Sequence, residues 1–485
     1  MPRAVLLSAT LALTLACHAA RPTDASAWLE LESPHFTVRT DLAEGSARVY
    51  VIELEHMRDA LFLGSWHGDA PPPGRMTILL VADQGEAAEF MSSHFAGLTT
   101  QDLFGEPIML LSAAQSPSQL DVLKHELAHW LDSAYLQRMP RWLNEGLACY
   151  LQTARTDSTN GTVVVGEPDR ARALRARDYA IDYSRILATR GAIGDESEDD
   201  LANFYAGAWA LVHYLADEER PRFTDYLHRL ARAEEPSAAY AAVFPELQGQ
   251  ELAKRLHQYL QRGRLGVGRL QVPEWRGEIS VRPLGAAELR AQRASLLLIG
   301  FGMKHDQQLR SRVRAEAEAA LAIDPAHPLA LAVLFALEAG QPATRLERAR
   351  ESAKAHPDDP RALLLLSDQL DNSPANTAEK RAVIERTVAL EPESARALIN
   401  LASIDLADNR AAEALPIALH AVKNDPAKAG GLMALAAAYA KNGLCAESAI
   451  AAERAFEVLP DRAPQSLLKH LRRRGAALAQ ECPAP

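Results

Sequence analysis

The sequence predicts two unlike domains, an α+β domain in the first half of the chain and an all-α helical solenoid in the second. Residues 28 to about 160 mix short apolar runs with amphipathic stretches, as expected for strands and helices in one α+β layer. From about Ala286 the composition shifts to Ala, Leu, Glu and Arg, and prolines recur every 32 to 35 residues. Such regular spacing is typical of a helical repeat. A chain of 485 residues is also too long for a single core.

Three apolar runs are the predicted strands of the first domain. They are Phe36 to Val38, Met76 to Val81 and Ile108 to Leu111, each following a segment that contains proline. Between the first two runs, Ala47 to Phe62 has the apolar spacing of a helix. We expect this domain to occupy residues 21–265.

The second half of the chain carries the repeat. A period near 34 residues with a proline closing each unit is the signature of tetratricopeptide repeats, because proline stops the second helix of each pair. We expect a tetratricopeptide-like domain over 286–485, with a capping helix from Asp461 to Gln480, and a linker at 266–285 before it. A helical bundle without repeats is the alternative. The closing prolines are Pro325, Pro357, Pro392, Pro426 and Pro460.

A predicted helix in the first domain carries two histidines with metal-ligand spacing. The helix opens at Ser116-Pro117 and contains His125-Glu126-Leu127-Ala128-His129. Residues i and i+4 share one helix face, so both imidazoles can reach one metal. Glu126 lies about 100° around the helix from His125, where a general base for a bound water must sit. The alternative is a helix with two histidines that bind no metal.

Glu145 is the expected third ligand. Fifteen residues separate it from His129, and Pro140 can begin a second helix that contains it. A turn between the two helices is enough for an antiparallel return that brings Glu145 to the histidines. Two histidines, one glutamate and a water form the open tetrahedral arrangement of catalytic zinc.

The same residues carry a resemblance to a known family. Trp142-Leu143-Asn144-Glu145-Gly146, placed beyond a His-Glu-x-x-His helix, resembles the gluzincin metallopeptidases, specifically the peptidase MA-like branch related to the M1 aminopeptidases. The resemblance covers roughly residues 30 to 230. It implies a zincin-like metallopeptidase fold with one Zn²⁺ bound by His125, His129 and Glu145.

The resemblance also implies two catalytic residues. Glu126 would act as acid and base on a zinc-bound water, whose pKa zinc lowers towards ~7. The stretch Phe204 to Leu215 is similar to the helix that carries the oxyanion-stabilising tyrosine in the M1 enzymes, and Tyr205 falls at the matching place, sixty residues after Glu145. Without the resemblance, the sequence around Tyr205 would predict a packing residue at the start of a helix.

Two departures from the family pattern change the expected activity. Nothing before the metal helix matches the Gly-x-Met-Glu-Asn segment that holds a substrate amine, so we expect an endopeptidase rather than an aminopeptidase. Ile108 to Leu111 is then the expected edge strand for the substrate backbone. The position four residues after Glu145 holds Cys149, so a partner for the ligands must come from elsewhere, and Asp121 and Asp132 are candidates.

The N-terminus has the pattern of an export signal. Arg3 precedes an apolar run from Ala4 to Ala16, which is too short to span a bilayer. We expect residues 1–20 to be a signal peptide and the protein to be exported. Cys17 follows an imperfect bacterial lipobox, which leaves two alternatives: an outer-membrane lipoprotein with a lipid anchor at Cys17, or a soluble periplasmic protein.

Three functions remain open. The first is an exported zinc metallopeptidase for peptide or protein substrates, whose repeats bind a protein partner or present the substrate. The second is an envelope scaffold or assembly protein with a vestigial or structural metal site, and the third is a metal-dependent hydrolase of other substrates. A net charge of -11 argues against nucleic-acid binding. Cys445 and Cys482 are expected either to pair or to remain free thiols.

Overall fold

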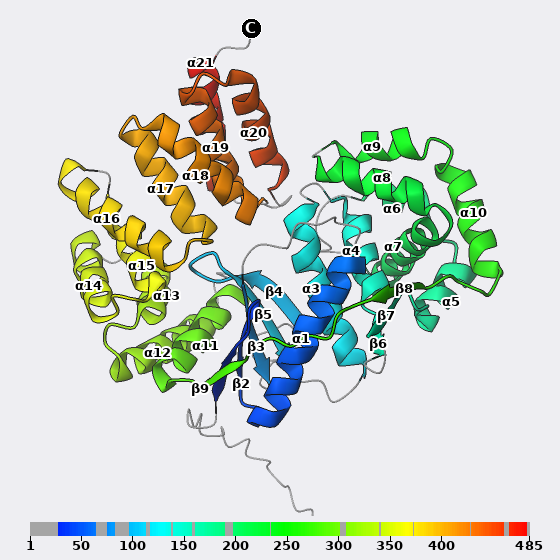
Figure 1. Ribbon diagram of the computed structural model, residues 1–485, viewed down its shortest axis with the longest axis horizontal. Helices are drawn as coiled ribbons and strands as arrows, with labels where there is room; N and C mark the ends of the chain where they lie inside the picture. Colours follow the sequence, from blue (N-terminus) through cyan, green and yellow to red (C-terminus); the bar gives the residue numbers. More distant parts are fainter. Residues whose placement is uncertain are drawn as a thin grey trace, which may run out of the picture.

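The computed structural model contains the two expected classes of structure. An N-terminal α+β domain with a mixed sheet precedes a C-terminal region of paired helices that resembles tetratricopeptide repeats (Figure 1). The structure describes residues 28–64, 75–82, 97–112, 117–136, 139–157, 161–189, 197–232, 234–300, 307–338, 341–371, 373–426, 428–459 and 465–482. The predicted signal peptide and Cys17 lie outside these residues.

The elements carry the labels of Figure 1. The strands are β1 (Leu29–Glu32), β2 (Phe36–Thr40), β3 (Met76–Val81), β4 (Gly97–Gln101), β5 (Pro107–Ser112), β6 (Arg155–Asp157), β7 (Thr162–Val165), β8 (Gly268–Gln271) and β9 (Ser280–Pro283). The helices of the first domain are α1 (Glu44–Gly64), α3 (Pro117–Tyr135), α4 (Arg141–Leu151), α5 (Arg170–Asp178), α6 (Tyr183–Ala188), α7 (Glu198–Glu218), α8 (Arg220–Ala231), α9 (Pro236–Val243) and α10 (Gly249–Gln261). The repeat region contains α11 (Ala286–Gly300), α12 (Gln307–Ile323), α13 (Pro328–Leu337), α14 (Pro342–Ala355), α15 (Pro360–Gln369), α16 (Pro374–Leu390), α17 (Ala395–Ala407), α18 (Ala411–Asn424), α19 (Ala429–Lys441), α20 (Cys445–Glu457) and α21 (Gln465–Glu481).

The larger sheet is mixed and has six strands in the order β4-β5-β3-β2-β1-β9. β2, β3 and β5 are mutually parallel, whereas β4, β1 and β9 pair antiparallel to their neighbours. The three predicted strands are confirmed as β2, β3 and β5. The prediction that Ile108 to Leu111 is an edge strand was wrong, because β5 has β4 on one side and β3 on the other. The edge strand beside it is β4.

The sheet is buried on both faces, which explains the continuous apolar runs of β3 and β5. On one face Met76, Ile78 and Leu80 pack in a core shared with α1, α3, α4 and α7. On the other face Leu79 and Val81 join a second core with α11, α12 and α13. The first helices of the repeat region therefore cover one side of the sheet, and the helices with the predicted ligands, α3 and α4, lie on the other.

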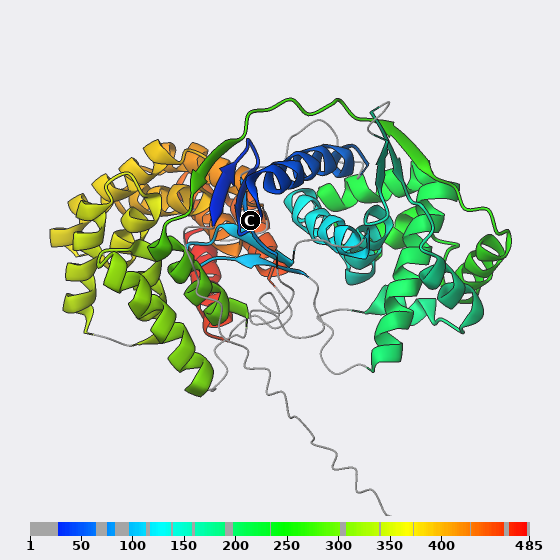
Figure 2. The ribbon, with the colours of Figure 1, turned by 90° about the horizontal axis from the view of Figure 1, so that it is seen from below.

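The segment 266–285 is more than the expected linker. Its β8 pairs antiparallel with β7 in a three-stranded sheet, and its β9 pairs antiparallel with β1 at the end of the large sheet. Figure 2 shows the segment running along α1 from one sheet to the other. Short strands with glycine and proline give little local signal, and the main-chain hydrogen bonds that define them come from partners more than 100 residues away.

The helix pairs follow the predicted repeat. Helices α12, α14, α16 and α18 end at Ile323, Ala355, Leu390 and Asn424, and the expected proline comes two residues after each end. The next helix begins three residues after each of these prolines. Pro460 lies outside the described residues. A repeating helical architecture is therefore confirmed, and α21 packs against α19 and α20 at its end.

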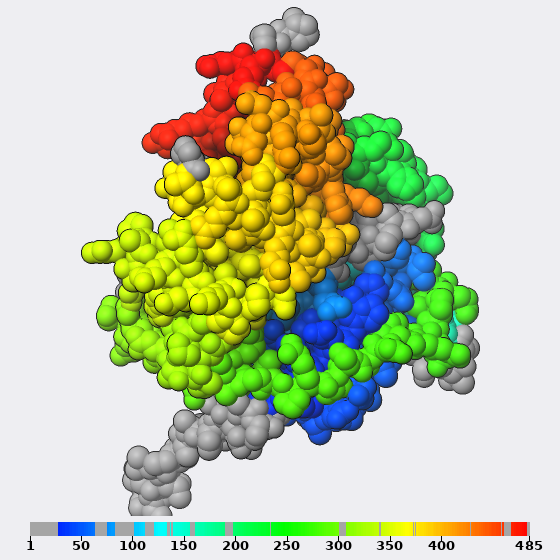
Figure 3. All heavy atoms as spheres, turned by 60° about the vertical axis from the view of Figure 1, so that its left-hand side comes forward, coloured from blue at the N-terminus to red at the C-terminus, as the bar shows by residue number. Residues whose placement is uncertain are grey.

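Buried ion pairs connect the repeat region to the sheet. Glu288 of α11 lies 2.7 Å from Arg39 of β2, 2.7 Å from Arg361 of α15 and 3.1 Å from His327 before α13. Burial by itself would raise the pKa of the Glu288 carboxyl, but the two guanidinium groups hold it well below its usual range. Glu288 is therefore an anion that joins three elements. In the space-filling view of Figure 3, the repeat region, in yellow and orange, lies directly against the N-terminal part of the chain, in blue.

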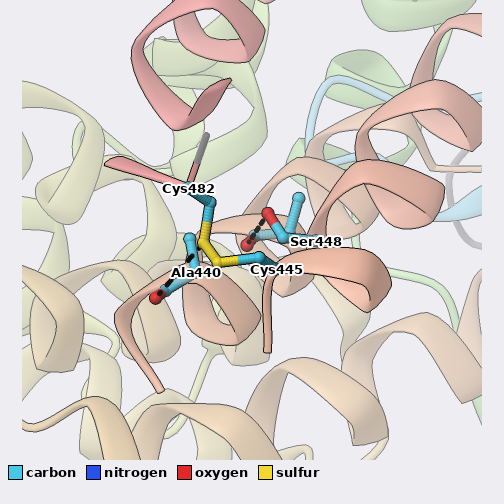
Figure 4. Close-up of a disulfide and its surroundings, with 5 residues drawn as sticks. Ala440, Cys445, Ser448 and Cys482 are labelled. Carbon is cyan, nitrogen blue, oxygen red and sulfur yellow. Dashed lines mark hydrogen bonds between the residues drawn. A yellow bond between two sulfur atoms is a disulfide. The ribbon is translucent and has the colours of Figure 1, made fainter. Parts of the chain in front are cut away.

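Cys445 and Cys482 form a disulfide that joins the start of α20 to the end of the chain after α21 (Figure 4). The pairing decides between the two alternatives that the sequence leaves open. The remaining described cysteine, Cys149, is a buried thiol. Among the described residues, no helix is long and apolar enough to cross a membrane.

Candidate metal centre

Two helices bring the predicted ligands together. The apolar face of α3 buries Leu123, Leu127 and Leu131, which leaves the histidines on the opposite face, one turn apart. α4 follows Pro140 as predicted and packs against α3. The N-cap position predicted for Ser116 lies outside the described residues, but α3 begins at Pro117.

The side chains of His125, His129 and Glu145 converge on one point. The two Nε2 atoms lie 3.1 Å apart. One carboxylate oxygen of Glu145, Oε2, lies 3.4 Å from Nε2 of His125 and 3.6 Å from Nε2 of His129. Among the described residues, this trio is the one group of three whose ligand atoms fall within 4.8 Å of one another.

The outer nitrogens of both rings face amide oxygens. Nδ1 of His125 lies 3.1 Å from Oε1 of Gln152, and Nδ1 of His129 lies 2.9 Å from Oδ1 of Asn144. An amide oxygen can only accept, so each Nδ1 carries the proton in this arrangement. Each neutral ring then presents the lone pair of its Nε2 to the centre of the cluster.

The cluster therefore has the chemistry of a cation site. Two imidazole lone pairs and a carboxylate oxygen face each other, which is repulsive unless a positive charge lies between them. The Oε2 atom of Glu145 is buried and has no hydrogen-bond partner. Three ligands at ~2.0–2.2 Å from a tetrahedral zinc ion lie roughly 3.3–3.5 Å apart, close to the three separations above. The residues present fit a single zinc ion.

In the protein without metal, a proton takes the place of the cation. Burial would lower the pKa of His129, but its contact with Glu145 outweighs burial and raises that pKa to about 9. Burial would likewise raise the pKa of Glu145, but His125 and His129 together lower it strongly. The cluster thus gathers positive charge around a fixed carboxylate.

The two predicted catalytic residues lie within electrostatic range of the cluster. The carboxylate of Glu126 raises the pKa of both His129 and Tyr205. Tyr205 lies in the first half of α7 and packs against the main core. Burial first, and then Glu145, raises the pKa of its phenol above the usual value, so the hydroxyl keeps its proton and remains a donor.

Asn144 and Gln152 are the partners of the histidines that the sequence did not identify. Asn144 precedes Glu145 in the motif, and Gln152 is the C-cap of α4, so their place on the ligand helix was the available signal. The Nδ1 atoms of the two histidines contact these amides rather than Asp121 or Asp132. Asp121 pairs with Lys124 at 2.9 Å, and Asp132 is fully buried within α3. Burial raises the pKa of the Cys149 thiol to about 12.

Gly146 sets the distance between the ligand helix and α7. A Cβ atom at this position would lie 2.6 Å from the carbonyl oxygen of Ala208 and 2.6 Å from Cγ2 of Val212. The backbones of α4 and α7 can approach this closely only because residue 146 is glycine. The neighbouring Arg141 also lies over the ring of Phe204, with 4.5 Å between Cζ and the centroid. Glu145 and Tyr205 are positioned by this one crossing.

Comparisons with known proteins assign no activity to the chain. Residues 123–236 match the family described as "Protein of unknown function (DUF1570)", and this span contains every predicted site residue. No curated protein matches the chain.

Solved structures with similarity to the chain include tetratricopeptide-repeat (TPR) proteins. A thermophilic TPR protein from Thermus thermophilus is 17% identical, with 40% of this chain and 100% of that chain covered and a TM-score of 0.30. YrrB, "a TPR protein with an unusual peptide-binding site", is 15% identical, with 39% and 100% covered and a TM-score of 0.27. MamA from Desulfovibrio magneticus is 18% identical, with 36% and 90% covered and a TM-score of 0.24. Similarity of this degree carries no functional conclusion.

Proposed function

We propose that the chain is an exported zinc-dependent metallopeptidase of the gluzincin type, with a zincin-like catalytic domain and an endopeptidase activity. The observation that carries the proposal is the convergence of both Nε2 lone pairs and the orphaned Glu145 oxygen on one point. Two helices that only supported the fold would not be expected to place three electron-pair donors at one point. The export signal and the choice between a Cys17 anchor and a soluble periplasmic form belong to the same proposal.

The proposed mechanism assigns one task to each group. His125, His129 and Glu145 would hold a zinc ion, which would lower the pKa of a bound water towards ~7. Glu126 takes a proton from the attacking water and returns it to the leaving amine. The hydroxyl of Tyr205 keeps its proton and donates a hydrogen bond to the oxygen that becomes negative during the attack. Asn144 and Gln152 hold the imidazole rings in the tautomer that leaves Nε2 free.

Removing the metal should abolish hydrolysis. We expect the purified chain to hold about one equivalent of zinc, measured by mass spectrometry of the metal. A quenched fluorescent peptide library should be cleaved by the zinc-loaded protein, remain intact after chelation, and be cleaved again when zinc is restored. Hydrolysis that persists in the metal-free protein would overturn the proposal.

A pair of histidine variants controls this experiment. His129→Ala should bind no zinc, because it removes one of the three converging ligand atoms. His420→Ala removes a histidine of α18 that pairs with Glu393 on the repeat surface, and should keep both the metal and the hydrolysis. Equal loss of zinc in both variants would indicate nonspecific binding rather than the proposed centre.

Zinc binding should also release a proton. The metal-free His129, with a pKa of about 9 against an ordinary 6.5, is protonated at neutral pH. The contact that raises this pKa stabilises the metal-free fold fully below pH 6.5, and this stabilisation is lost as pH rises through 9. Zinc affinity should therefore increase from pH 6 to 9, with about one proton released per ion at pH 7. Calorimetry in two buffers of different ionisation heat measures the release, and a pH-independent affinity would contradict it.

A second function rests on the repeat architecture, which the structure contains. In that case the protein is an envelope scaffold or assembly factor whose metal centre is vestigial or structural. The repeat architecture itself favours this second function, and none of the comparisons supports the peptidase. A complementation experiment with the Glu126→Gln variant distinguishes the two functions. The variant's ability to restore the phenotype of a strain that lacks the protein would favour the scaffold, and its failure would favour catalysis.

A further inference from the structure

The loop between β4 and β5 is a preformed turn. Oδ1 of Asp102 accepts hydrogen bonds from the backbone N–H groups of Phe104 at 2.8 Å and Glu106 at 3.0 Å. Gly105 has a φ of 83°, in the left-handed region that favours glycine. The loop, defined here as Asp102 to Glu106, thus has its shape encoded locally.

The aromatic side chain of this loop lies inside the repeat region. Phe104 is 1% exposed and belongs to the buried apolar cluster built by α13, α15 and α17, which includes Leu331, Leu364 and Ile404. The guanidinium of Arg396 lies 6.0 Å from the centroid of its ring. A phenylalanine of the first domain therefore completes the core of the second.

Side chains of the repeat region bind the loop mainly through the loop's main-chain carbonyl groups. Arg396 donates to the carbonyl of Leu103 at 3.0 Å, and Lys428 donates to the carbonyl of Gly105 at 3.3 Å. Ser394 lies 3.4 Å from the carboxylate of Glu106. The three donors lie at the N-terminal ends of α17 and α19. Backbone contacts around one buried aromatic anchor are typical of peptide recognition.

The acidic side chains of the loop are partly buried beside the fully buried anchor. Burial, followed by the neighbouring carboxylate of Glu391, raises the pKa of Glu106 to about 7, against the opposing effect of Lys428. Burial also raises the pKa of Asp102, although Arg361 and Arg396 oppose it. The repeat region thus interacts with the charged side chains of the loop as well as with its aromatic anchor.

The other end of the same hairpin reaches the metal helix. β4 is an edge strand of the sheet and packs against α3, as Figure 1 shows for the strands beside that helix. The loop therefore joins the N-terminal ends of α17 and α19 to a strand that packs against α3, the helix of His125 and His129.

We propose that the repeat surface formed by α15, α17 and the start of α19 is a peptide-binding site whose internal ligand is the chain's own Asp102–Glu106 loop. The external partner that fits it is a protein segment with the same chemistry, an acidic turn with an aromatic anchor followed by glycine and glutamate. Such a segment competes with the loop for Arg396 and Lys428. Its binding displaces the loop that follows β4, so that occupancy of the repeats reaches the strand that packs against α3.

The test removes the loop from the proposed peptide-binding site and keeps the rest of the chain. Replacing residues 102–106 by Asn-Gly keeps the β4–β5 hairpin, because a two-residue turn joins antiparallel strands. A fluorescein-labelled peptide with the sequence of residues 101–107 should bind this variant about tenfold or more tighter than it binds the wild type. The peptide with alanine in place of its phenylalanine should bind neither protein. Binding is measured by anisotropy without metal, so the outcome is independent of the proposed peptidase.

A matched pair of arginine variants assigns the site. In the vacated protein, Arg396→Ala should weaken peptide binding at least about tenfold, whereas Arg386→Ala, on α16 with contacts to Pro357 and Asp358, should leave it unchanged. Equal affinity of the peptide for the wild type and the folded vacated variant would overturn the proposal.

A second measurement tests the proposal if the variant without the loop does not fold. In the full chain with its loop intact, Arg396→Ala together with Lys428→Met should speed the backbone hydrogen exchange of residues 97–101. Arg386→Ala should not change that exchange. Exchange that is unchanged in the double variant would contradict the link between the repeats and the β4 edge.

Discussion

Glu126→Gln should abolish peptide hydrolysis and leave one zinc ion bound. Glutamine keeps the size of the side chain but cannot accept a proton, and loss of a general acid–base group lowers kcat about 10²- to 10⁴-fold. The ligand atoms of His125, His129 and Glu145 are untouched by this change. We expect zinc content and melting temperature to match the wild type while kcat falls and KM changes little.

The control is an acid-to-amide change of the same size away from the cluster. Glu53 is exposed on α1, and Glu53→Gln should retain full activity. Hydrolysis by the Glu126→Gln variant at more than a tenth of the wild-type rate would remove Glu126 from the mechanism. Loss of zinc from this variant would instead indicate that Glu126 supports the ligands rather than the reacting water.

Gly146→Val should destabilise the first domain and weaken its metal centre. The added side chain begins 2.6 Å from a backbone oxygen of α7, and that backbone cannot move away as a flexible side chain would. Overpacking of this kind costs roughly 1–3 kcal/mol of the free energy of unfolding. Because Glu145 and Asn144 share α4 with Gly146, zinc affinity should also fall, by about 10- to 100-fold. Urea unfolding and zinc titration against a competing chelator measure the two effects.

Gly45 provides the matched glycine. A Cβ atom at this position of α1 meets no other atom within 4 Å, so Gly45→Ala should preserve zinc affinity. Alanine in a helix should also stabilise the fold by up to about 1 kcal/mol. Wild-type stability in Gly146→Val would show that α4 and α7 are farther apart in solution than the structure places them.

Local patterns in the sequence accounted for the metal helix and for the repeats. The spacing of His125 and His129 determines that both face one side of a helix, because that relation depends only on 3.6 residues per turn. The prolines between the helix pairs also act locally. Each one ends a helix because it lacks an N–H group and has a fixed φ. The proximity of Glu145 was predictable because only one turn separates the two ligand helices.

Contacts between distant segments were decided by the tertiary structure alone. The assignment of Asn144 and Gln152 to the histidines depends on how α4 crosses α3, which no periodicity encodes. The position of β5 inside the sheet depends on pairing with β4, and the strands in 266–285 depend on partners far back in the chain. Phe104 in the repeat core is the clearest case. Its apolar character was visible in the sequence, but the partner that buries it lies more than 200 residues away, and long-range packing selects that partner.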